Sequence, residues 1–210
     1  MKVTWIGHSC FKIESNGYSI VIDPYEDGSV PGLHPVREQA DMVLCSHEHG
    51  DHNARHCVEI NSSGAENPFK ITKIETYHDD KKGFLRGSNT IHIIEDGNSR
   101  IAHLGDLGCM LTEEQMIDLS GLDAVLIPVG GYYTIDASQA VKLLDRIKPR
   151  MILPMHYQSS EKAGLTFGYE VLDSLVGFLE YFDSVATLEE SVVDTEETSA
   201  NVVVLRPQNV

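Results

Sequence analysis

Three histidines and an aspartate stand within six consecutive positions, which read His47-Glu48-His49-Gly50-Asp51-His52. Imidazole and carboxylate groups suit zinc and other divalent first-row metals. His47 and His49 point to the same side of an extended segment, because side chains alternate along it. So short a segment cannot easily place four ligands around one ion, but it can contribute to two. The pattern therefore predicts two adjacent metals that need further ligands from elsewhere in the chain.

Three further ligands are expected at the ends of strands. His78 follows the alternating run 70–77, Asp106 follows the apolar run 101–104, and His156 ends the apolar run that begins at Ile152. Each run is short, strand-like and bounded by turn residues. Strand ends at one edge of a sandwich converge in space, so these side chains are predicted to complete the site.

In this order, the seven residues resemble the ligand set of the binuclear members of the metallo-β-lactamase superfamily. Neighbouring segments resemble its bacterial and archaeal metal-dependent hydrolase branch, which includes ascorbate-6-phosphate lactonase. These segments are Gly7-His8-Ser9-Cys10-Phe11, Ile22-Asp23-Pro24, Leu104-Gly105-Asp106-Leu107-Gly108, the stretch 127–134 and Pro154-Met155-His156-Tyr157. Cys109 departs from the pattern, since that branch often has His there, so the resemblance does not extend a proton-transfer or substrate role to this position.

The resemblance implies a four-layer αββα sandwich of the mixed α/β (α+β) class, with one domain spanning residues 1–210. It implies that His47, His49 and His78 hold one metal, that Asp51, His52 and His156 hold the other, and that Asp106 bridges both. A metal-bridging hydroxide, oriented by Asp51 as the catalytic residue, would attack a small ester, lactone or phosphodiester. Zinc is the first expectation for both ions, and Mn²⁺, Fe²⁺ or Ni²⁺ would fit the same ligands.

Other residues are expected near the site but not as ligands. His8 follows Gly7 at a turn and is expected in the second layer or against the substrate, as are the hydroxyls of Tyr133 and Thr134. Lys81, Lys82 and Arg86 lie in the loop after His78, where a solvated loop and a contact with an anionic substrate are both open readings. His103 is expected to be structural or to lie in the second layer. His34, His56 and His92 are expected on the surface or on a helix.

Composition constrains the alternatives. With 16 basic and 32 acidic residues the formal charge is −16, which disfavours nucleic-acid binding and hence a nuclease of the same superfamily. An iron-dependent oxidoreductase on this fold is a second alternative, but its di-iron members carry Glu where this chain has His49. A metal-binding protein without catalysis is the third. The expected partner is a small molecule, with no membrane, and a homo-oligomer stays open.

The chain shows no apolar run long enough to span a bilayer and no signal-peptide pattern, so a cytoplasmic location is expected. The four cysteines have no Cys-x-x-Cys spacing and are read as reduced thiols. A thiolate ligand from Cys109 is the open alternative.

The site must be positioned by strands with few helices. Strands are predicted over 2–6, 10–14, 19–22, 42–45, 71–77, 90–95, 100–104, 124–127, 151–153 and 201–205. Capping boxes predict helices that begin at Thr112 and Asp136, and an apolar pattern predicts a third over 169–182. The acidic run 189–197 is predicted to be a solvated loop.

Overall fold

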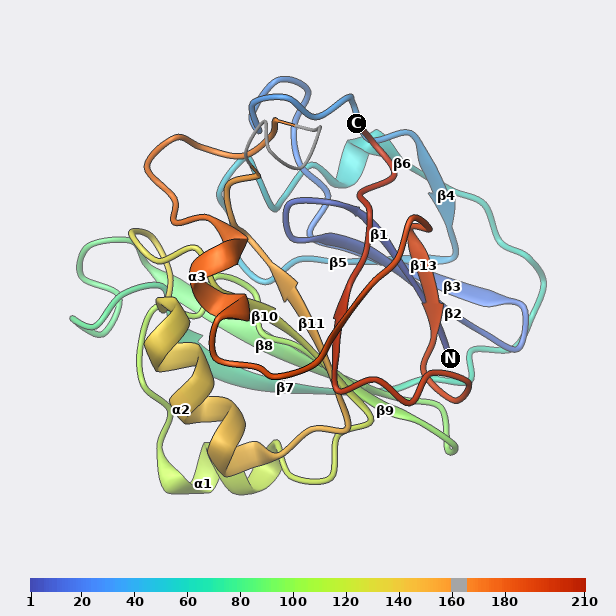
Figure 1. Ribbon diagram of the computed structural model, residues 1–210. Helices are drawn as coiled ribbons and strands as arrows, with labels where there is room; N and C mark the ends of the chain where they lie inside the picture. Colours follow the sequence, from blue (N-terminus) through green and yellow to red (C-terminus); the bar gives the residue numbers. More distant parts are fainter. Residues whose placement is uncertain (160–165) are drawn as a thin grey trace.

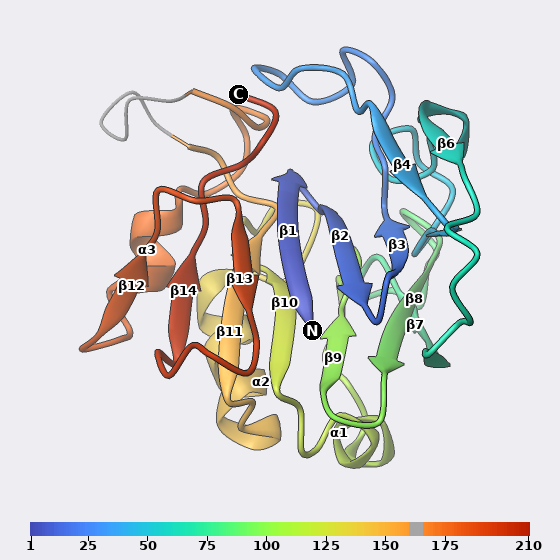
Figure 2. The same cartoon turned by 90° about the vertical axis from the view of Figure 1, so that its right-hand side faces the viewer.

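Two β-sheets pack face to face in the computed structural model, which describes residues 1–159 and 166–210 (Figures 1 and 2). The five-stranded sheet has the order β13 (Val192–Asp194), β1 (Lys2–Gly7), β2 (Cys10–Ser15), β3 (Tyr18–Ile22), β5 (Met42–Leu44). The seven-stranded sheet has the order β12 (Val185–Thr187), β14 (Val202–Val204), β11 (Met151–Met155), β10 (Ala124–Pro128), β9 (Arg100–His103), β8 (Ser88–Glu95), β7 (Lys70–Tyr77).

Strand direction explains why distant residues meet at one edge. In the first sheet, β1 and β3 both run antiparallel to β2, and β5 runs parallel to β3. In the second, β9, β10 and β11 are parallel, and β7 shares their direction because it is antiparallel to β8, which is antiparallel to β9. The carboxyl ends of β7, β9 and β11 therefore lie at one edge of their sheet, as those of β1, β3 and β5 do in the other.

The core lies between the sheets and beneath the helices. Residues of β10 and β11 are buried along their whole length, as expected for central parallel strands covered on both faces. The edge strand β7 instead alternates, with Ile74 and Thr76 buried between exposed neighbours. Inward side chains of both sheets, including Trp5, Ile22 and Ile93, belong to one hydrophobic cluster. This packing fixes the strand ends on which the site depends.

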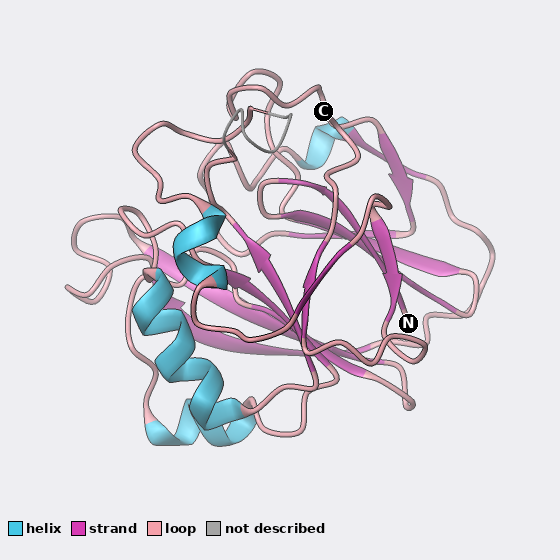
Figure 3. Cartoon of the chain, viewed as in Figure 1, coloured by secondary structure: helices cyan, strands magenta, loops and turns pink. Residues whose placement is uncertain are grey.

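The α-helices of the described residues cover the outer face of the seven-stranded sheet (Figures 1 and 3). They are α1 (Glu113–Asp118), α2 (Ala137–Ile147) and α3 (Leu175–Leu179). The capping boxes of Thr112 and Asp136 form as predicted. The helix predicted over 169–182 is wrong for most of its length. Asp173 exchanges backbone hydrogen bonds with Gly130 and Gln158, so helix begins only after Ser174. Within the described residues, no helix is long and apolar enough to cross a bilayer.

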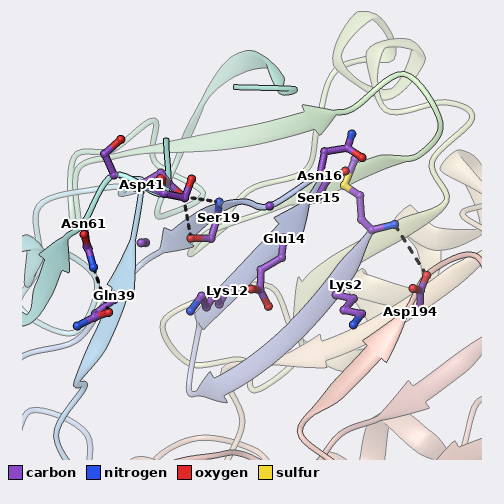
Figure 4. A pocket seen from close by; sticks show the side chains of 15 residues that line it. Lys2, Lys12, Glu14, Ser15, Asn16, Ser19, Gln39, Asp41, Asn61 and Asp194 are labelled. Carbon is purple, nitrogen blue, oxygen red and sulfur yellow. Dashed lines mark hydrogen bonds and ion pairs between the residues drawn. The ribbon is translucent and has the colours of Figure 1, made fainter. Parts of the chain in front are cut away.

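The outer face of the five-stranded sheet is polar. A shallow hollow of about 660 Å³ lies there, lined by side chains such as Lys2, Lys12 and Glu14 (Figure 4). Asp41 accepts hydrogen bonds from the backbone nitrogen and hydroxyl of Ser19 beside it. The predicted sandwich of two sheets with covering helices is confirmed. The α-helices found in residues 1–159 and 166–210 form the helical layer over the seven-stranded sheet. A small sheet of β4 (Glu38–Ala40) and β6 (Val58–Ile60), with the 3₁₀ turn η1 (Arg55–Cys57), accompanies the five-stranded sheet.

The predicted strands are present with ends shifted by a few residues, whereas four strands of three residues each, β4, β6, β12 and β13, were not predicted. The prediction that 189–197 is only a solvated loop is wrong. Val193 is buried and pairs with Val3, so β13 covers the free edge of β1 within the acidic run. Three residues are too few for an alternating pattern to be recognised among flanking carboxylates.

Candidate metal centre

Six of the seven residues predicted as ligands gather at the shared strand edge in two groups. The first consists of His47, His49 and His78, which offer ligand atoms within 4.8 Å of one another. The second consists of Asp51, His52 and His156, with His8 as an additional member, at the same spacing. The two groups contain the residues of the two ligand sets predicted from sequence, and His8 lies with the second.

Asp106 lies between the two groups. Its Oδ2 is 3.1 Å from Nε2 of His78 and 3.2 Å from Nε2 of His156, while its Oδ1 is 3.2 Å from Nε2 of His52. Nε2 of His47 is 3.9 Å from Oδ2. One carboxylate therefore faces imidazoles of both groups, which is the arrangement a bridging ligand requires.

Residues with positive φ redirect the chain towards the site at the end of several strands. His8 after β1, Asp23 after β3 and His156 after β11 all have positive φ, between 51° and 53°. Non-glycine residues rarely adopt this conformation and do so mostly at functional sites. Gly105 (φ 56°) makes the corresponding turn before Asp106, and a Cβ there would lie 2.3 Å from the Asn89 side-chain oxygen.

A second layer of hydrogen bonds holds the candidate ligands. Asp23 Oδ2 lies 2.8 Å from Nδ1 of His52, and its carboxylate also accepts hydrogen bonds from the nitrogen and hydroxyl of Ser46. Ser46 Oγ is 2.9 Å from Nδ1 of His47. Asn89 Oδ1 accepts a hydrogen bond from the backbone nitrogen of Asp106 at 2.9 Å. Partners at Nδ1 leave Nε2 of these histidines facing the centre, as second-layer partners of metal sites do.

Protonation states in the cluster suit metal binding. Burial, together with nearby histidines, lowers the pKa of His47 to about 3 and of His8 to about 4, so these imidazoles are neutral donors at pH 7. Burial opposes ionisation of Asp51 and Asp106, but the surrounding histidines hold the pKa of both carboxyls well below the usual range. Metal ligands must be deprotonated. His52 is the exception: burial opposes its charged form, but Asp106 and Asp51 raise its pKa well above the ordinary value, so a cation would have to displace its proton.

Unsatisfied polar atoms provide a second test of fit. Among the described residues, Nε2 of His47, Nε2 of His52 and Oδ1 of Asp106 are buried without a hydrogen-bond partner. A buried polar atom without a partner costs free energy, so native structures rarely leave one unexplained. Three such atoms that converge on one point fit cations held between the two groups.

A cavity of about 380 Å³ opens above the cluster. Its lining consists of His49, Asp51, His78, Leu85, Arg86, Asp106, Tyr133, His156 and Tyr169. The hydroxyl of Tyr169 donates a hydrogen bond to Asp51 Oδ2 at 3.2 Å. A cavity of this size, with a few convergent polar groups, is typical of a small-molecule site.

The structure brings some of the predicted substrate contacts to this cavity but not others. Tyr133 and Arg86 line it. Thr134 does not, and its hydroxyl donates to the carbonyl of Ile135. Lys81 is paired with Asp80 and, like Lys82, lies outside the lining.

Several residues of the site were not given a role from sequence. Asp23 and Asn89 carry second-layer hydrogen bonds, and Tyr169 was assigned to a helix that begins only at Leu175. The Ile22-Asp23-Pro24 segment was a usable signal for Asp23, because a carboxylate directly after an apolar strand needs a buried partner. Nothing local marks Asn89 or Tyr169, whose partners lie far away in sequence.

Three predictions about histidine and cysteine can now be compared with the structure. His34 and His56 are exposed as predicted, but His92 is buried in β8, so its assignment to the surface is wrong. Residues 91–94 of β8 are all buried, so no alternation along the strand marks His92 as a core residue. His103 is structural, since its Nε2 contacts the Ser9 carbonyl at 2.8 Å. Cys109 belongs to none of the metal-binding groups found in the described residues.

Comparison with known proteins agrees with this geometry. A family model for the β-lactamase superfamily domain matches residues 2–156. The chain is a member of the metallo-β-lactamase superfamily. Its relatives include a protein from Desulforamulus reducens named as a metal-dependent hydrolase, which is 28% identical over 76% of this chain and 85% of the relative. A Pyrococcus abyssi relative is 31% identical over 75% of this chain and 83% of its own length.

Solved structures of this superfamily share the fold. A candidate Zn-dependent hydrolase from Thermotoga maritima superimposes with a TM-score of 0.74 at 33% identity, over 97% of both chains. A metallo hydrolase from Ignicoccus hospitalis gives a TM-score of 0.66 at 20% identity, over 98% of this chain and 95% of that one. At the lower identity the likeness shows the fold alone.

Proposed function

We propose that this member of the superfamily is a hydrolase that uses two divalent metal ions, with zinc as first candidate, to cleave a small ester, lactone or phosphodiester. The observation that carries the proposal is the Asp106 carboxylate, which faces His78 on one side and His52 and His156 from the other group. A single-ion site would not need a carboxylate shared between two sets of imidazoles.

When bound, the two ions would lower the pKa of a water towards about 7 and polarise the scissile carbonyl or phosphoryl group. His47, His49 and His78 would hold one ion, and Asp51, His52 and His156 the other, with Asp106 shared. His8 is close enough to Asp51, at 3.5 Å between Nε2 and Oδ2, to act either as an additional donor or as a partner that fixes that carboxylate.

Asp51 is the proposed catalytic carboxylate. It is ionised and lines the cavity, and its Oδ2 accepts a hydrogen bond from the Tyr169 hydroxyl. A carboxylate in this position can accept a proton from the attacking water and orient its lone pair towards the substrate. The Tyr169 O–H can turn from Asp51 to an oxygen of the substrate as charge develops there.

Cavity size and charge support a small substrate over a nucleic acid. The cavity holds a molecule of modest size, and the formal charge of −16 would repel a polyanion. Zinc, the number of ions and the substrate class are parts of the proposal.

The test begins with metal analysis of protein loaded with Zn²⁺ or Mn²⁺ and freed of excess ion. Loaded protein is then assayed on a lactone, an aryl ester and an aryl phosphodiester. The proposal expects about two ions per chain, hydrolysis of at least one class, loss on chelation and recovery on reloading. Full loading with two ions and no hydrolysis across the three classes would contradict it.

A further inference from the structure

A single arginine reaches the cavity of a strongly acidic protein. Arg86 lines the space above the cluster together with His49, Asp51 and Tyr133, and the lining contains no lysine. Its guanidinium carbon lies 5.4 Å from the centre of the Tyr133 ring. Within the described residues, no carboxylate forms an ion pair with it, although the chain carries 32 acidic residues. An arginine left without a carboxylate beside a ligand cavity is available to an anion from outside.

The loop that carries Arg86 is held by one buried carboxylate. Asp79 is 2% exposed, and its Oδ1 accepts hydrogen bonds from the backbone nitrogens of Lys81 and Gly83 at 2.7 and 3.0 Å. Its Oδ2 accepts those of Leu85 and Arg86 at 2.9 and 2.8 Å. Since Asp79 directly follows His78, these bonds tie the backbone of Arg86 to a candidate metal ligand. A residue anchored in this way is pre-organised to bind without first ordering its loop.

The surroundings of Arg86 combine an aromatic face with apolar surface. Tyr133 stacks against its guanidinium and lies 6.1 Å from the Tyr169 ring. Leu85 also lines the cavity, and its neighbour Phe84 is 85% exposed. Stacking on tyrosine holds the guanidinium plane while its N–H groups stay free for a bidentate contact. The imidazoles and carboxylates of the cluster therefore lie at one end of the cavity, with a cation and apolar groups beside it.

We propose that Arg86 recognises an anionic group of the substrate, a carboxylate or phosphate separate from the bond that is cleaved. This inference rests on the proposed hydrolase function and narrows it to anionic substrates. One anchored cation offsets the repulsion that the acidic protein exerts on an anion, and it orients the scissile group towards Asp51 and Asp106. Leu85 and Tyr133 would contact the carbon chain between the two groups.

Equilibrium binding tests the role of Arg86 without catalysis. Three acids share the same chain and differ at one end: butyrate has no second anion, glutarate has a carboxylate, and 4-phosphonobutyrate has a phosphonate. Calorimetry on the metal-loaded protein measures how much more tightly the two dianions bind than butyrate. We expect a preference of about tenfold or more for at least one dianion, which Arg86→Gln removes. The dianion that is preferred identifies carboxylate or phosphate as the group recognised.

Lys82→Gln is the matched control, because it removes the same charge from the same loop outside the cavity lining. It should keep the preference for the dianion. No preference in the unmodified protein, a preference unchanged by Arg86→Gln, or an equal loss in Lys82→Gln would each overturn the proposal. Circular dichroism confirms that the Arg86→Gln variant is folded.

Hydrolysis gives the second readout. The p-nitrophenyl monoester of glutarate carries the remote carboxylate, and p-nitrophenyl butyrate lacks it. Arg86→Gln should lower kcat/KM for the anionic ester by about tenfold, mainly through KM, and have a clearly smaller effect on the neutral ester. Equal losses on both esters would overturn the specific role of Arg86. If the loaded protein hydrolyses neither ester nor the other classes, the hydrolase proposal fails while calorimetry still decides the anion site.

Discussion

His52 is held between two carboxylates: Asp23 Oδ2 lies 2.8 Å from its Nδ1, and Asp106 Oδ1 lies 3.2 Å from its Nε2. Burial would raise the pKa of Asp23, but His103, with hydrogen bonds from His52 and Ser46, lowers it to about 2. The ionised carboxylate accepts a hydrogen bond from Nδ1, so Nε2 is the ring nitrogen that faces the centre. The ring orientation of His52 thus depends on a residue that is not itself a candidate ligand.

Asp23→Ala should therefore weaken metal binding without removing a ligand. Loss of a second-layer carboxylate typically lowers metal affinity by about 10–100-fold, and we expect a loss in that range. Competition with a chromophoric chelator measures it.

Asp41→Ala is the control for Asp23→Ala. Asp41 also has a pKa lowered to about 2, by hydrogen bonds from Ser63 and Ser19, but it lies on the polar outer side of the sheet. Its removal should leave metal affinity within about twofold. Equal losses in both variants would indicate a general effect on folding rather than a role of Asp23 at His52.

The number of ions that a variant retains should depend on whether the substitution affects one ligand group or both. His49→Ala removes a donor from the first group and Asp51→Ala from the second, so each should retain about one tightly bound ion. Asp106→Ala should lose both, because the shared carboxylate serves both groups. Elemental analysis after desalting gives the count. A wild-type protein that holds one ion when fully loaded would refute the binuclear arrangement.

Substitution of Asp51 should reduce turnover without disturbing the fold. Asp51→Ala is expected to reduce turnover by at least about 100-fold, because it removes a donor and the carboxylate that faces the nucleophile. Its far-UV circular dichroism should match wild type, since Asp51 lies outside the hydrophobic core.

His56→Ala is the comparison for Asp51→Ala. His56 is 69% exposed in its side chain and contacts Glu26 at 3.3 Å rather than the cluster. With Glu26 and Cys57 it forms a separate surface group of metal-binding type. Turnover should stay near wild type. Loss of activity in this variant with both ions in place would show that the roles assigned along the motif are wrong.

Binding to generic RNA or DNA should be weak at physiological salt. The formal charge of −16 gives long-range repulsion, and Arg86 offers one cation rather than a basic surface. Fluorescence anisotropy with a labelled single strand, at two salt concentrations, checks this. Submicromolar binding that weakens steeply with salt would favour the nuclease alternative.

His92 should make the protein sensitive to acid. Burial lowers its pKa from an ordinary value near 6.5 to about 4. The folded state therefore binds this proton less readily than the unfolded state, so stability is complete above about pH 6.5 and falls as the pH drops towards 4. Between pH 7.5 and 5 the contribution is on the order of 2 kcal/mol.

Urea unfolding of metal-free protein at the two pH values measures this contribution. His92→Gln should reduce the stability difference between pH 7.5 and 5. The exposed His34 serves as control, and His34→Gln should keep the wild-type difference. The same pH dependence in wild type and His92→Gln would remove His92 as a source of acid sensitivity.

The sequence predicted which residues gather in the cluster because the candidate ligands follow strand ends, and strand ends can be recognised locally. His78 after β7 and His156 after β11 are examples. The capped helices at Thr112 and Asp136 were predictable for the same reason, since their signals lie within four residues. Signals that lie within a few residues of one another are retained when the chain packs into its tertiary structure.

The cavity wall was less predictable. Tyr169 reaches Asp51 across 118 positions of sequence, and the segment around it gives up helical structure for contacts with Gly130 and Gln158. The Asp79 carboxylate shapes the Arg86 loop through backbone nitrogens, which carry no sequence signature. Such features depend on tertiary contacts that outweigh local preference.

The candidate ligands and the cavity wall are positioned by different parts of the chain. The ligands depend on strands that share one direction within each sheet, namely β1, β3 and β5 in one sheet and β7, β9 and β11 in the other. All seven candidate ligands follow strand ends that the core holds in place, whereas Arg86, Tyr133 and Tyr169 lie on connecting segments and are not candidate ligands themselves. Substitutions of those three residues can change the cavity wall while the candidate ligands stay where they are. A sandwich built in this way can diversify its chemistry through its loops and keep a single metal centre throughout.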